Sequence, residues 1–395
     1  MKAVKLGDIC ELITRGISPK YTEDEKLGVT VLNQKCIRNK AVLYEFGRLH
    51  SLSVKSVNES KFVKSGDVLV NSTGHGTLGR TALAENVDKP LLVDSHVTIL
   101  RPVEGLFEPR YFAYLIGQSE NDFIDMATGT SGQTELPRAL LNEYKVSYEP
   151  SLEEQRRIVA RLDAAFEKIS AAEVLTQQNL DNVSALQKSI LHQQLKVSDN
   201  TRNYSLADAG FIQTGTTPKT SIRSYYGGDI AFIKPSDFHD DGSLNMNGQK
   251  LSVSGLSVGR LIDKNSVLMV CIGATIGKVG YTDTSLSCNQ QINAITLNSF
   301  EEAKYLYYIM TTDSFQENVK SGSNQMTLPI INKTSWGNLT VDLPDLNTQK
   351  EIVAKLDDTL GKTRKLESQY QKKLAKLVDL RQSLLAEAFS TTNTV

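Results

Sequence analysis

The sequence predicts an α+β fold in which two pseudo-symmetric, mostly β modules are joined by two long helices that form an antiparallel coiled coil. Three observations predict it: a repeated motif, a heptad pattern after each copy, and short alternating apolar runs elsewhere. The chain has 395 residues, a length at which a single core usually divides into domains. We expect modules at residues 1–149 and 199–343, a first helix with its linker at 150–198, and a second helix at 344–391.

The repeat is clearest where each module ends. Residues 150–163 (PSLEEQRRIVARLD) align without gaps on residues 344–357 (PDLNTQKEIVAKLD), with eight of fourteen positions identical. At the same offset, residues 110–115 (RYFAYL) match residues 304–309 (KYLYYI). Between these anchors the halves differ almost completely, as expected of two similar modules that read different targets. Drift after duplication would give the same pattern.

Each repeated tail is predicted to be one long helix. Residues 151–196 contain no proline or glycine, and apolar residues recur alternately every three and four positions. Thr176 and Asn179 interrupt this pattern, and they either fix the register of the coiled coil or lie at a partly solvated edge. At about 1.5 Å per residue each helix spans roughly 60 to 70 Å, too long for a small domain's core. The predicted helix seam consists of Ile158, Leu162, Ile169, Val183, Leu186, Ile190, Ile352, Leu356, Leu366, Leu377, Leu380 and Leu384.

The modules themselves are predicted to be mostly β. Alternating apolar runs at residues 29–32, 67–70 and 266–270 indicate short strands, and frequent Gly and Asn indicate turns between them. One amphipathic helix is expected to close each module, near residues 109–118 and 301–311. Each module is therefore an α+β unit on a helical stalk.

Composition excludes several classes of protein. No apolar segment resembles a signal peptide, and no 18 apolar residues run uninterrupted, so secretion and membrane spanning are not expected. The four cysteines lie far apart without CxxC spacing, which argues against a disulfide framework and against a zinc site. We predict a cytoplasmic protein.

The sequence carries no motif of an enzyme. It lacks the Asp/Asn-Pro-Pro-aromatic string of an amino-methyltransferase, a GxGxxG for AdoMet or a dinucleotide, and clustered metal ligands. Asp237, Asp240 and Asp241 have no Glu-x-Lys or Asp-x-Lys partner, so a solvated turn is expected there rather than a nuclease site. We predict a non-catalytic chain with no catalytic residue, no metal and no cofactor of its own.

Charge is unevenly distributed although the net charge is only −1. Residues 1–80 hold 13 Lys/Arg and 8 Asp/Glu, whereas residues 81–149 hold 5 and 11. The second module repeats this weakly, with 8 and 7 over residues 199–280 and 3 and 6 over residues 281–343. Such segregation allows a basic face for phosphate contact on a nearly neutral protein.

Basic side chains and loops rich in Asn and Gln are the candidate contacts to DNA. Lys and Arg bind phosphates and guanine, and Asn and Gln amides pair with adenine. Solvated surface charge and ordinary turn chemistry are the alternatives for each residue. The candidates are Arg15, Lys20, Tyr21, Asn33, Gln34, Lys35, Arg38, Thr73, His75, Arg80, Gln133, Lys219, Tyr226, Lys234, Ser236, Lys278, Gln290, Gln291 and Gln325.

Over essentially its whole length the chain resembles the DNA specificity (S) subunits of type I restriction–modification systems. The resemblance is carried by the Pro-x-Leu-x-x-Gln-x-x-Ile-Val-Ala-x-Leu-Asp start of each helix and by the helix ends at 187–191 and 381–385. Residues 225–230 (YYGGDI), 236–238 (SDF) and 289–291 (NQQ) add to it. The first module departs from this pattern, because residues 16–21 (GISPKY) and 31–37 (VLNQKCI) look like another variety of recognition domain.

The resemblance implies that each module is a target recognition domain that reads one half of an asymmetric, bipartite site in double-stranded DNA. It implies that the helix pair sets the spacing and docks two methyltransferase (M) subunits, which restriction/translocase (R) subunits join. AdoMet, ATP and Mg would then belong to these partner subunits, and the complex would serve in phage defence. Two alternatives remain: the specificity subunit of a fused type II-like methyltransferase–nuclease, and a coiled-coil scaffold that binds no DNA.

Overall fold

The computed structural model describes residues 3–24, 26, 28–129, 134–196, 201–323 and 329–390. The chain divides into two compact units, Met1–Thr176 with Lys372–Val395 and Gln177–Gln371. Each unit therefore contains one module together with parts of both long helices.

The first module contains two four-stranded sheets. Its main sheet has the order β2-β11-β8-β9 and is antiparallel, and the second has the order β10-β4-β7-β3, with β10 and β4 parallel. All residues of β8 are buried because it is a central strand. The strands are β1 (Val4–Lys5), β2 (Cys10–Arg15), β3 (Tyr21–Thr22), β4 (Gly28–Leu32), β5 (Ile37–Arg38), β6 (Ala41–Val42), β7 (Arg48–Ser51), β8 (Val68–Asn71), β9 (Thr81–Leu83), β10 (Leu91–Val93), β11 (Val97–Pro102) and β12 (Lys145–Val146). The helices are α1 (Leu6–Ile9), α2 (Pro109–Gly117), α3 (Glu120–Asp125) and α4 (Arg138–Glu143), with short 3-10 helices η1 (Gln34–Cys36), η2 (Tyr44–Phe46) and η3 (Glu59–Lys61).

The second module repeats this plan. Its main sheet has the order β14-β21-β18-β19, and its second sheet, β16-β15-β20-β17, again contains one parallel pair, β15 with β20. The edge strands of the second sheets differ between the modules, where the sequences also differ most. The strands are β13 (Arg202–Ser205), β14 (Phe211–Thr214), β15 (Tyr226–Ile233), β16 (Lys250–Leu251), β17 (Leu261–Ile262), β18 (Ser266–Val270), β19 (Val279–Thr282), β20 (Leu286–Cys288), β21 (Ile292–Thr296) and β22 (Thr340–Leu343). The helices are α6 (Leu206–Ala209), α7 (Val253–Val258), α8 (Phe300–Met310), α9 (Asp313–Ser321) and α10 (Lys333–Gly337), with η4 (Arg223–Tyr225) and η5 (Pro235–Asp237).

The two amphipathic helices are present as α2 and α8, but they do not close the modules as predicted. Two shorter helices and a final strand follow each of them, and that strand pairs with the first strand of its module, β12 with β1 and β22 with β13. Apart from the nine-residue α9, these elements have two to six residues and are too short to show a readable hydrophobic period. The start of α8 is well specified, since Ser299 and Glu302 form a reciprocal capping box.

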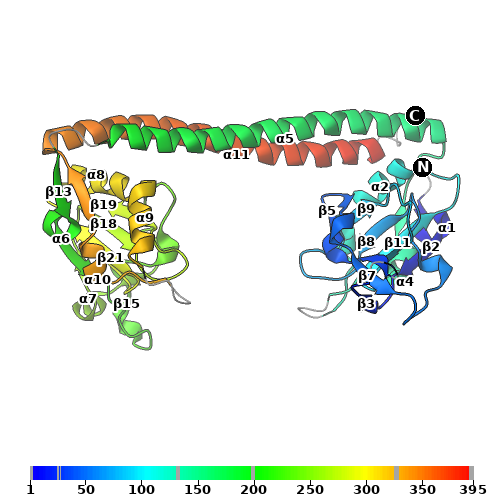
Figure 1. Ribbon diagram of the computed structural model, residues 1–395, viewed down its shortest axis with the longest axis horizontal. Helices are drawn as coiled ribbons and strands as arrows, with labels where there is room; N and C mark the ends of the chain where they lie inside the picture. Colours follow the sequence, from blue (N-terminus) through cyan, green and yellow to red (C-terminus); the bar gives the residue numbers. More distant parts are fainter. Residues whose placement is uncertain are drawn as a thin grey trace. The chain divides into compact units, whose positions relative to one another are not determined.

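The long helices α5 (Leu152–Gln194) and α11 (Leu346–Ser390) have 43 and 45 residues. Within the first unit they run antiparallel, as Figure 1 shows. The Tyr111 hydroxyl accepts from Glu149 N–H just before α5 begins, and the Tyr111 ring lies 5.2 Å from the ring of Phe389 at the end of α11. Further along α5, Glu173 pairs with Arg381 of α11 at 3.3 Å. The end of α11 thus lies beside the start of α5.

The predicted seam is wrong at three positions. Leu186, Leu366 and Leu380 have relative exposures of 49%, 37% and 46%. The neighbouring positions face the partner helix instead: Gln187 donates to Thr363 Oγ1 at 3.2 Å and to Glu367 Oε2 at 3.4 Å. A prediction from apolar heptad spacing places leucine, not a neighbouring polar residue, in the seam. Here the neighbouring polar residues are hydrogen-bonded between the helices instead.

Thr176, one of the two polar interruptions, is fully buried. Its hydroxyl donates to Ala172 O of the same helix at 2.6 Å, which satisfies the group locally. The solvated-edge interpretation is therefore wrong for Thr176, while Asn179 is half-buried.

Candidate nucleic-acid interface

In the first module, backbone hydrogen bonds bring four separate segments to one edge of the sheets. Asp94 N donates to Leu32 O at the end of β4, and Ser72 N after β8 donates to His96 O, both at 2.8 Å. Leu136 N donates to Ser72 O at 2.8 Å. Polar loop residues that are distant in sequence are consequently neighbours.

The second module makes the same three bonds with different residues. Asn289 N donates to Ile233 O at 3.0 Å and Cys271 N donates to Gln291 O at 2.7 Å. Ile331 N donates to Cys271 O at 3.0 Å. The two modules thus share a backbone frame at this edge while their loop sequences differ.

Several predicted contact residues are bound to their own module. Arg15 pairs with Glu135 at 2.6 Å and donates to Leu136 O at 2.8 Å, which ties β2 to the segment before α4. Thr73 Oγ1 and His96 Nδ1 are 2.7 Å apart. For Arg15 and Thr73, a direct contact with DNA stays a prediction.

Amide side chains in the first module support the loops. The buried Asn71 donates to Gln34 O at 3.0 Å and to Thr77 O at 3.2 Å. Asn33 Oδ1 accepts from Lys35 N at 2.8 Å and caps η1. The sequence pointed to the loops at Asn33 and Asn71 as suited to base readout; in the structure Asn71 is buried and holds these loops together.

Polar side chains of the second module likewise form hydrogen bonds within their own loops. Tyr226 donates to Pro218 O at 2.6 Å, and Gln290 Oε1 accepts from the Thr217 hydroxyl. Gln291 Oε1 accepts from Asn289 Nδ2 at 2.9 Å. Lys234 N donates to Asp237 Oδ2 at 2.8 Å, so this carboxylate caps η5, as expected for a turn.

The remaining candidates divide by exposure. Tyr21 is 44% exposed, and the guanidinium carbon of Arg48 lies 3.6 Å from the centroid of its ring in a cation–π contact. Gln133 and Gln325 lie outside the described residues. Exposed side chains belong to Lys20, Tyr21, Lys35, Arg38, His75, Lys219, Ser236, Lys278 and Gln290, and partly buried ones to Arg15, Asn33, Gln34, Thr73, Arg80, Tyr226, Lys234 and Gln291.

Three candidates, Arg38, His75 and Arg80, meet in one surface hollow of about 690 Å³. We call it the basic hollow. Lys40, which sequence reasoning did not select, contributes a fourth basic side chain; the Asn-Lys pair between two short apolar runs was the available turn signal. The lining residues are Arg38, Asn39, Lys40, His75, Gly76, Thr77, Arg80 and Glu120.

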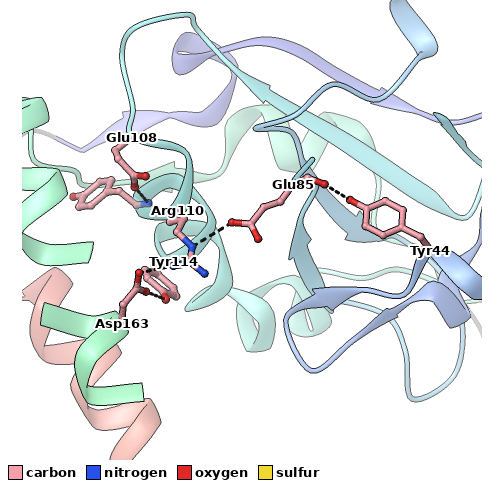
Figure 2. Close-up of polar contacts among 7 residues, drawn as sticks. Tyr44, Glu85, Glu108, Arg110, Tyr114 and Asp163 are labelled. Atoms are coloured by element: carbon pink, nitrogen blue, oxygen red, sulfur yellow. Dashed lines mark hydrogen bonds and ion pairs between the residues drawn. The ribbon is translucent and has the colours of Figure 1, made fainter. Parts of the chain in front are cut away.

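The first module is attached to α5 by a group of polar contacts around Asp163 (Figure 2). Arg110 of α2 pairs with Asp163 at 2.5 Å, and the Tyr114 hydroxyl donates to the same carboxylate. Arg110 also pairs with Glu85 at 3.2 Å, whose backbone oxygen accepts from Tyr44 at 2.8 Å. Burial, the hydrogen bond to Asp163 and the charge of Asp163 raise the pKa of Tyr114, so Tyr114 stays a neutral donor.

The second module repeats this attachment. Lys304 of α8 pairs with Asp357 of α11, and the Tyr308 hydroxyl donates to Asp357. Burial, followed by the hydrogen bond to Asp357, raises the pKa of Tyr308. These contacts explain why the sequence repeat is strongest in two places, the module helix and the first turns of the long helix.

No group of three or more His, Cys, Asp or Glu side chains in the described part of the chain is arranged to bind a metal. All four cysteines are free and buried, and desolvation raises the pKa of Cys10, Cys271 and Cys288 to about 12. None of the described helices combines the length and apolar composition that a membrane span requires.

Comparison with known proteins matches both halves of the chain to one family. A family model described as the type I restriction modification DNA specificity domain matches residues 1–179 and 199–376. The HindI specificity subunit of Haemophilus influenzae is 29% identical over 40% of this chain, and the match spans 36% of that subunit. The MjaIX specificity subunit of Methanocaldococcus jannaschii is 26% identical, with 40% of its length matched. The putative MjaX specificity subunit of the same organism is 23% identical over 95% of this chain and 91% of its own length.

Two solved structures have the same fold. A chain from a type I R-M system, solved to explain complex assembly and conformational transition, has a TM-score of 0.79 at 20% identity, covering 98% of this chain and 97% of its own. The HsdS subunit from Thermoanaerobacter tengcongensis has a TM-score of 0.56 at 19% identity, with 98% and 96% covered. These likenesses confirm the predicted fold class.

Proposed function

Because the chain belongs to the type I restriction modification DNA specificity domain family, we propose that it is the DNA-recognition subunit of a type I restriction–modification complex. The resemblance drawn from the sequence is confirmed by this family match and by relatives that are themselves named specificity subunits. The chain is a non-catalytic specificity subunit, so methylation and cleavage are activities of its partners.

We propose further that each module reads one half of an asymmetric, bipartite site in double-stranded DNA. The observation that supports this most is the shared backbone frame: Ser72 and Cys271 make equivalent bonds, yet the loops around them differ in sequence. A fixed frame with variable loops suits two readers of different base sequences, since base-edge contacts specify and backbone contacts position.

We propose that the helix pair sets the spacing between the half-sites and docks two methyltransferase subunits, to which restriction/translocase subunits are added. Helices of 43 and 45 residues span roughly 65 Å at 1.5 Å per residue, longer than one DNA turn of about 34 Å. AdoMet, ATP and Mg are then cofactors of those partners. The complex would act in the cytoplasm, where it would meet phage DNA.

The test is to co-express the chain with its methyltransferase subunit in a methylation-free host and to map N6-methyladenine by sequencing. We expect a bipartite, asymmetric motif that vanishes when this chain is omitted. A folded, active methyltransferase complex without such a motif would refute the recognition role and favour a scaffold that binds no DNA.

A further inference from the structure

The basic hollow is built on a two-residue hairpin turn between β5 and β6. Asn39 and Lys40 have φ of 51° and 63°. This left-handed backbone conformation is tolerated by Asn but is uncommon for Lys. From this turn the Lys40 ammonium donates to Gly117 O at 2.7 Å and pairs with Glu120 Oε1 at 2.7 Å. This turn thus places a fixed ammonium group in the wall of the hollow.

Glu120 is the one carboxylate among the lining residues, and its neighbours already engage it. Besides Lys40, its Oε1 accepts from Thr81 N at 2.6 Å and from Thr81 Oγ1 at 2.9 Å. The charge of Glu120 therefore offsets that of Lys40, and the remaining positive charge of the hollow comes from Arg38 and Arg80.

The two arginines are uncompensated. Arg38 Nε donates to Lys35 O at 3.1 Å, and Arg80 donates to Gly76 O at 2.7 Å. Among the described residues, neither guanidinium has a carboxylate within 4.0 Å. A guanidinium has five N–H donors, so most of them remain available to an acceptor in the hollow.

The second module differs at this place. Its chain after η5 carries His239, Asp240 and Asp241, where the chain after η1 in the first module carries Arg38, Asn39 and Lys40. Asp241 Oδ1 accepts from Ser243 N at 2.9 Å and from Ser243 Oγ at 2.6 Å, which keeps this turn acidic. Positive charge at this connection is therefore a feature of the first module.

We propose that the basic hollow binds one phosphodiester group of the DNA backbone beside the half-site that the first module reads. Planar guanidinium groups match the oxygens of a phosphate and bind it bidentately. Gly76 also has φ of 72°, and a side chain there would meet no atom within 4 Å, so the backbone is open to the ligand. The proposal rests on the proposed function and adds to it an anchor in which Arg38 acts together with Arg80; the second module keeps a cation only at the Arg80 position, as Lys278.

The test uses the complex of this chain with its methyltransferase subunit and a duplex carrying its mapped target. Binding is measured as a function of salt for the wild type, for Arg38→Ala/Arg80→Ala, and for a control of equal charge, Lys64→Ala/Lys89→Ala. The control residues are exposed side chains of the same module outside the hollow. Losing one phosphate contact should lower the slope of log K against log salt by about 0.9. Affinity for target and non-target DNA should fall roughly tenfold in the first variant and much less in the control.

A second arm identifies the phosphate. Each phosphate of the first half-site is replaced in turn by a neutral methylphosphonate. One replacement should weaken binding to the wild type roughly tenfold and leave the Arg38→Ala/Arg80→Ala complex unaffected. Equal salt slopes for the wild type and this variant, or a variant that removes none of the methylphosphonate losses, would overturn the proposal. A wild-type complex that binds no specific target would instead refute the proposed function, so the two failures are distinguishable.

Discussion

The two modules share a backbone frame, but one equivalent pair of polar residues at the two central strands of the main sheet differs between them. In the first module Arg101 and Asp67 form two hydrogen bonds of 2.7 Å, and the residues are 7% and 1% exposed. In the second module the matching cross-strand pair is Ser266 and Thr296, whose hydroxyls are 2.7 Å apart. A buried ion pair in one module therefore corresponds to a buried hydroxyl pair in the other.

The difference teaches what the duplicated fold requires. Buried polar side chains need hydrogen-bond partners, but the two partners can be an ion pair or two neutral hydroxyls, provided that both change together. By contrast, the attachments to the long helices pair a tyrosine and a cation with an aspartate in both modules, and only the cation changes, from Arg110 to Lys304. Divergence has thus reached the sheet interior as well as the loops, while the contacts between module and helix have stayed alike.

The largest expected effect follows from breaking the ion pair. Asp67→Ala leaves the buried Arg101 with Phe62 O and, at 4.0 Å, the half-exposed Glu11 as its partners; a buried charge so weakly compensated costs about 3 kcal/mol. We expect hydrogen exchange of the β8 and β11 amides to accelerate while β18 and β21 stay protected, together with a lower denaturant midpoint.

The matched change in the second module is Ser266→Ala. It removes the neutral hydrogen bonds of this hydroxyl with Thr296 Oγ1 and Asp263 O and should lower the free energy of unfolding by about 1–2 kcal/mol. Replacing the ion pair by its counterpart, with Asp67→Ser and Arg101→Thr together, should cost less than Asp67→Ala. If the double variant were the more unstable one, the idea that the pairs are interchangeable would fail.

A similar or smaller effect is expected where the ends of the long helices complete the modules. Phe389 of α11 is 9% exposed against the core of the first module, and Leu195 after α5 packs, partly buried, against the core of the second. Phe389→Ala should destabilise the first module by about 3 kcal/mol, because a buried aromatic ring is removed. Leu195→Ala should cost about 1 kcal/mol in the second. Hydrogen exchange resolved by module measures both, and equal losses would contradict the difference in burial.

Much of this architecture could be predicted because it depends on periodic or repeated sequence. The long helices followed from a shared heptad pattern, free of proline and glycine in α5 and interrupted only by Gly361 in α11, and the attachment contacts lie within the matching segments around Asp163 and Asp357. The seam failed at Leu186 because polar pairing between Gln187 and Thr363 decided which face turned inward.

The candidate site was harder to predict, because exposure and pairing depend on tertiary contacts. Arg15 and Arg80 are alike as sequence, but Arg15 pairs with Glu135, 120 residues away, whereas Arg80 lines the basic hollow. Lys40 was missed because its role depends on a left-handed turn and on the distant Glu120. A pattern of residue types contains neither fact.

The cations that hold the modules to the helices allow a finer comparison. Lys304 has a side-chain exposure of 17% beside Asp357, whereas that of Arg110 is 48% beside Asp163. Lys304→Ala should therefore cost about 1–2 kcal/mol and Arg110→Ala about 0.5 kcal/mol, since exposed pairs are screened by water. Denaturant midpoints in low and high salt measure this. Salt should weaken the wild type more than either variant, and a larger loss for Arg110→Ala would contradict the argument.

The smallest difference is expected in alkaline solution, where both modules hold a tyrosine hydroxyl against a carboxylate. Folding raises the pKa of Tyr308 above its usual value near 10, mainly through burial and then through the hydrogen bond to Asp357. The unfolded chain therefore releases this proton first, so the stabilising contribution is complete below pH 10 and is lost as pH rises further. For the buried Tyr308 the loss approaches about 1.4 kcal/mol per pH unit above 10.

Tyr308→Phe should lower stability at pH 8 by about 1 kcal/mol and flatten the decline between pH 10 and 11. Tyr114→Phe should flatten it to a similar extent, because burial and the hydrogen bond to Asp163 raise the pKa of Tyr114 above this pH range as well. Urea midpoints at half-unit steps from pH 8 to 11 measure both slopes. Parallel declines in the wild type and in Tyr308→Phe would show that this hydroxyl is not held neutral by Asp357, and the two attachments would then differ in chemistry despite their shared tyrosine and aspartate.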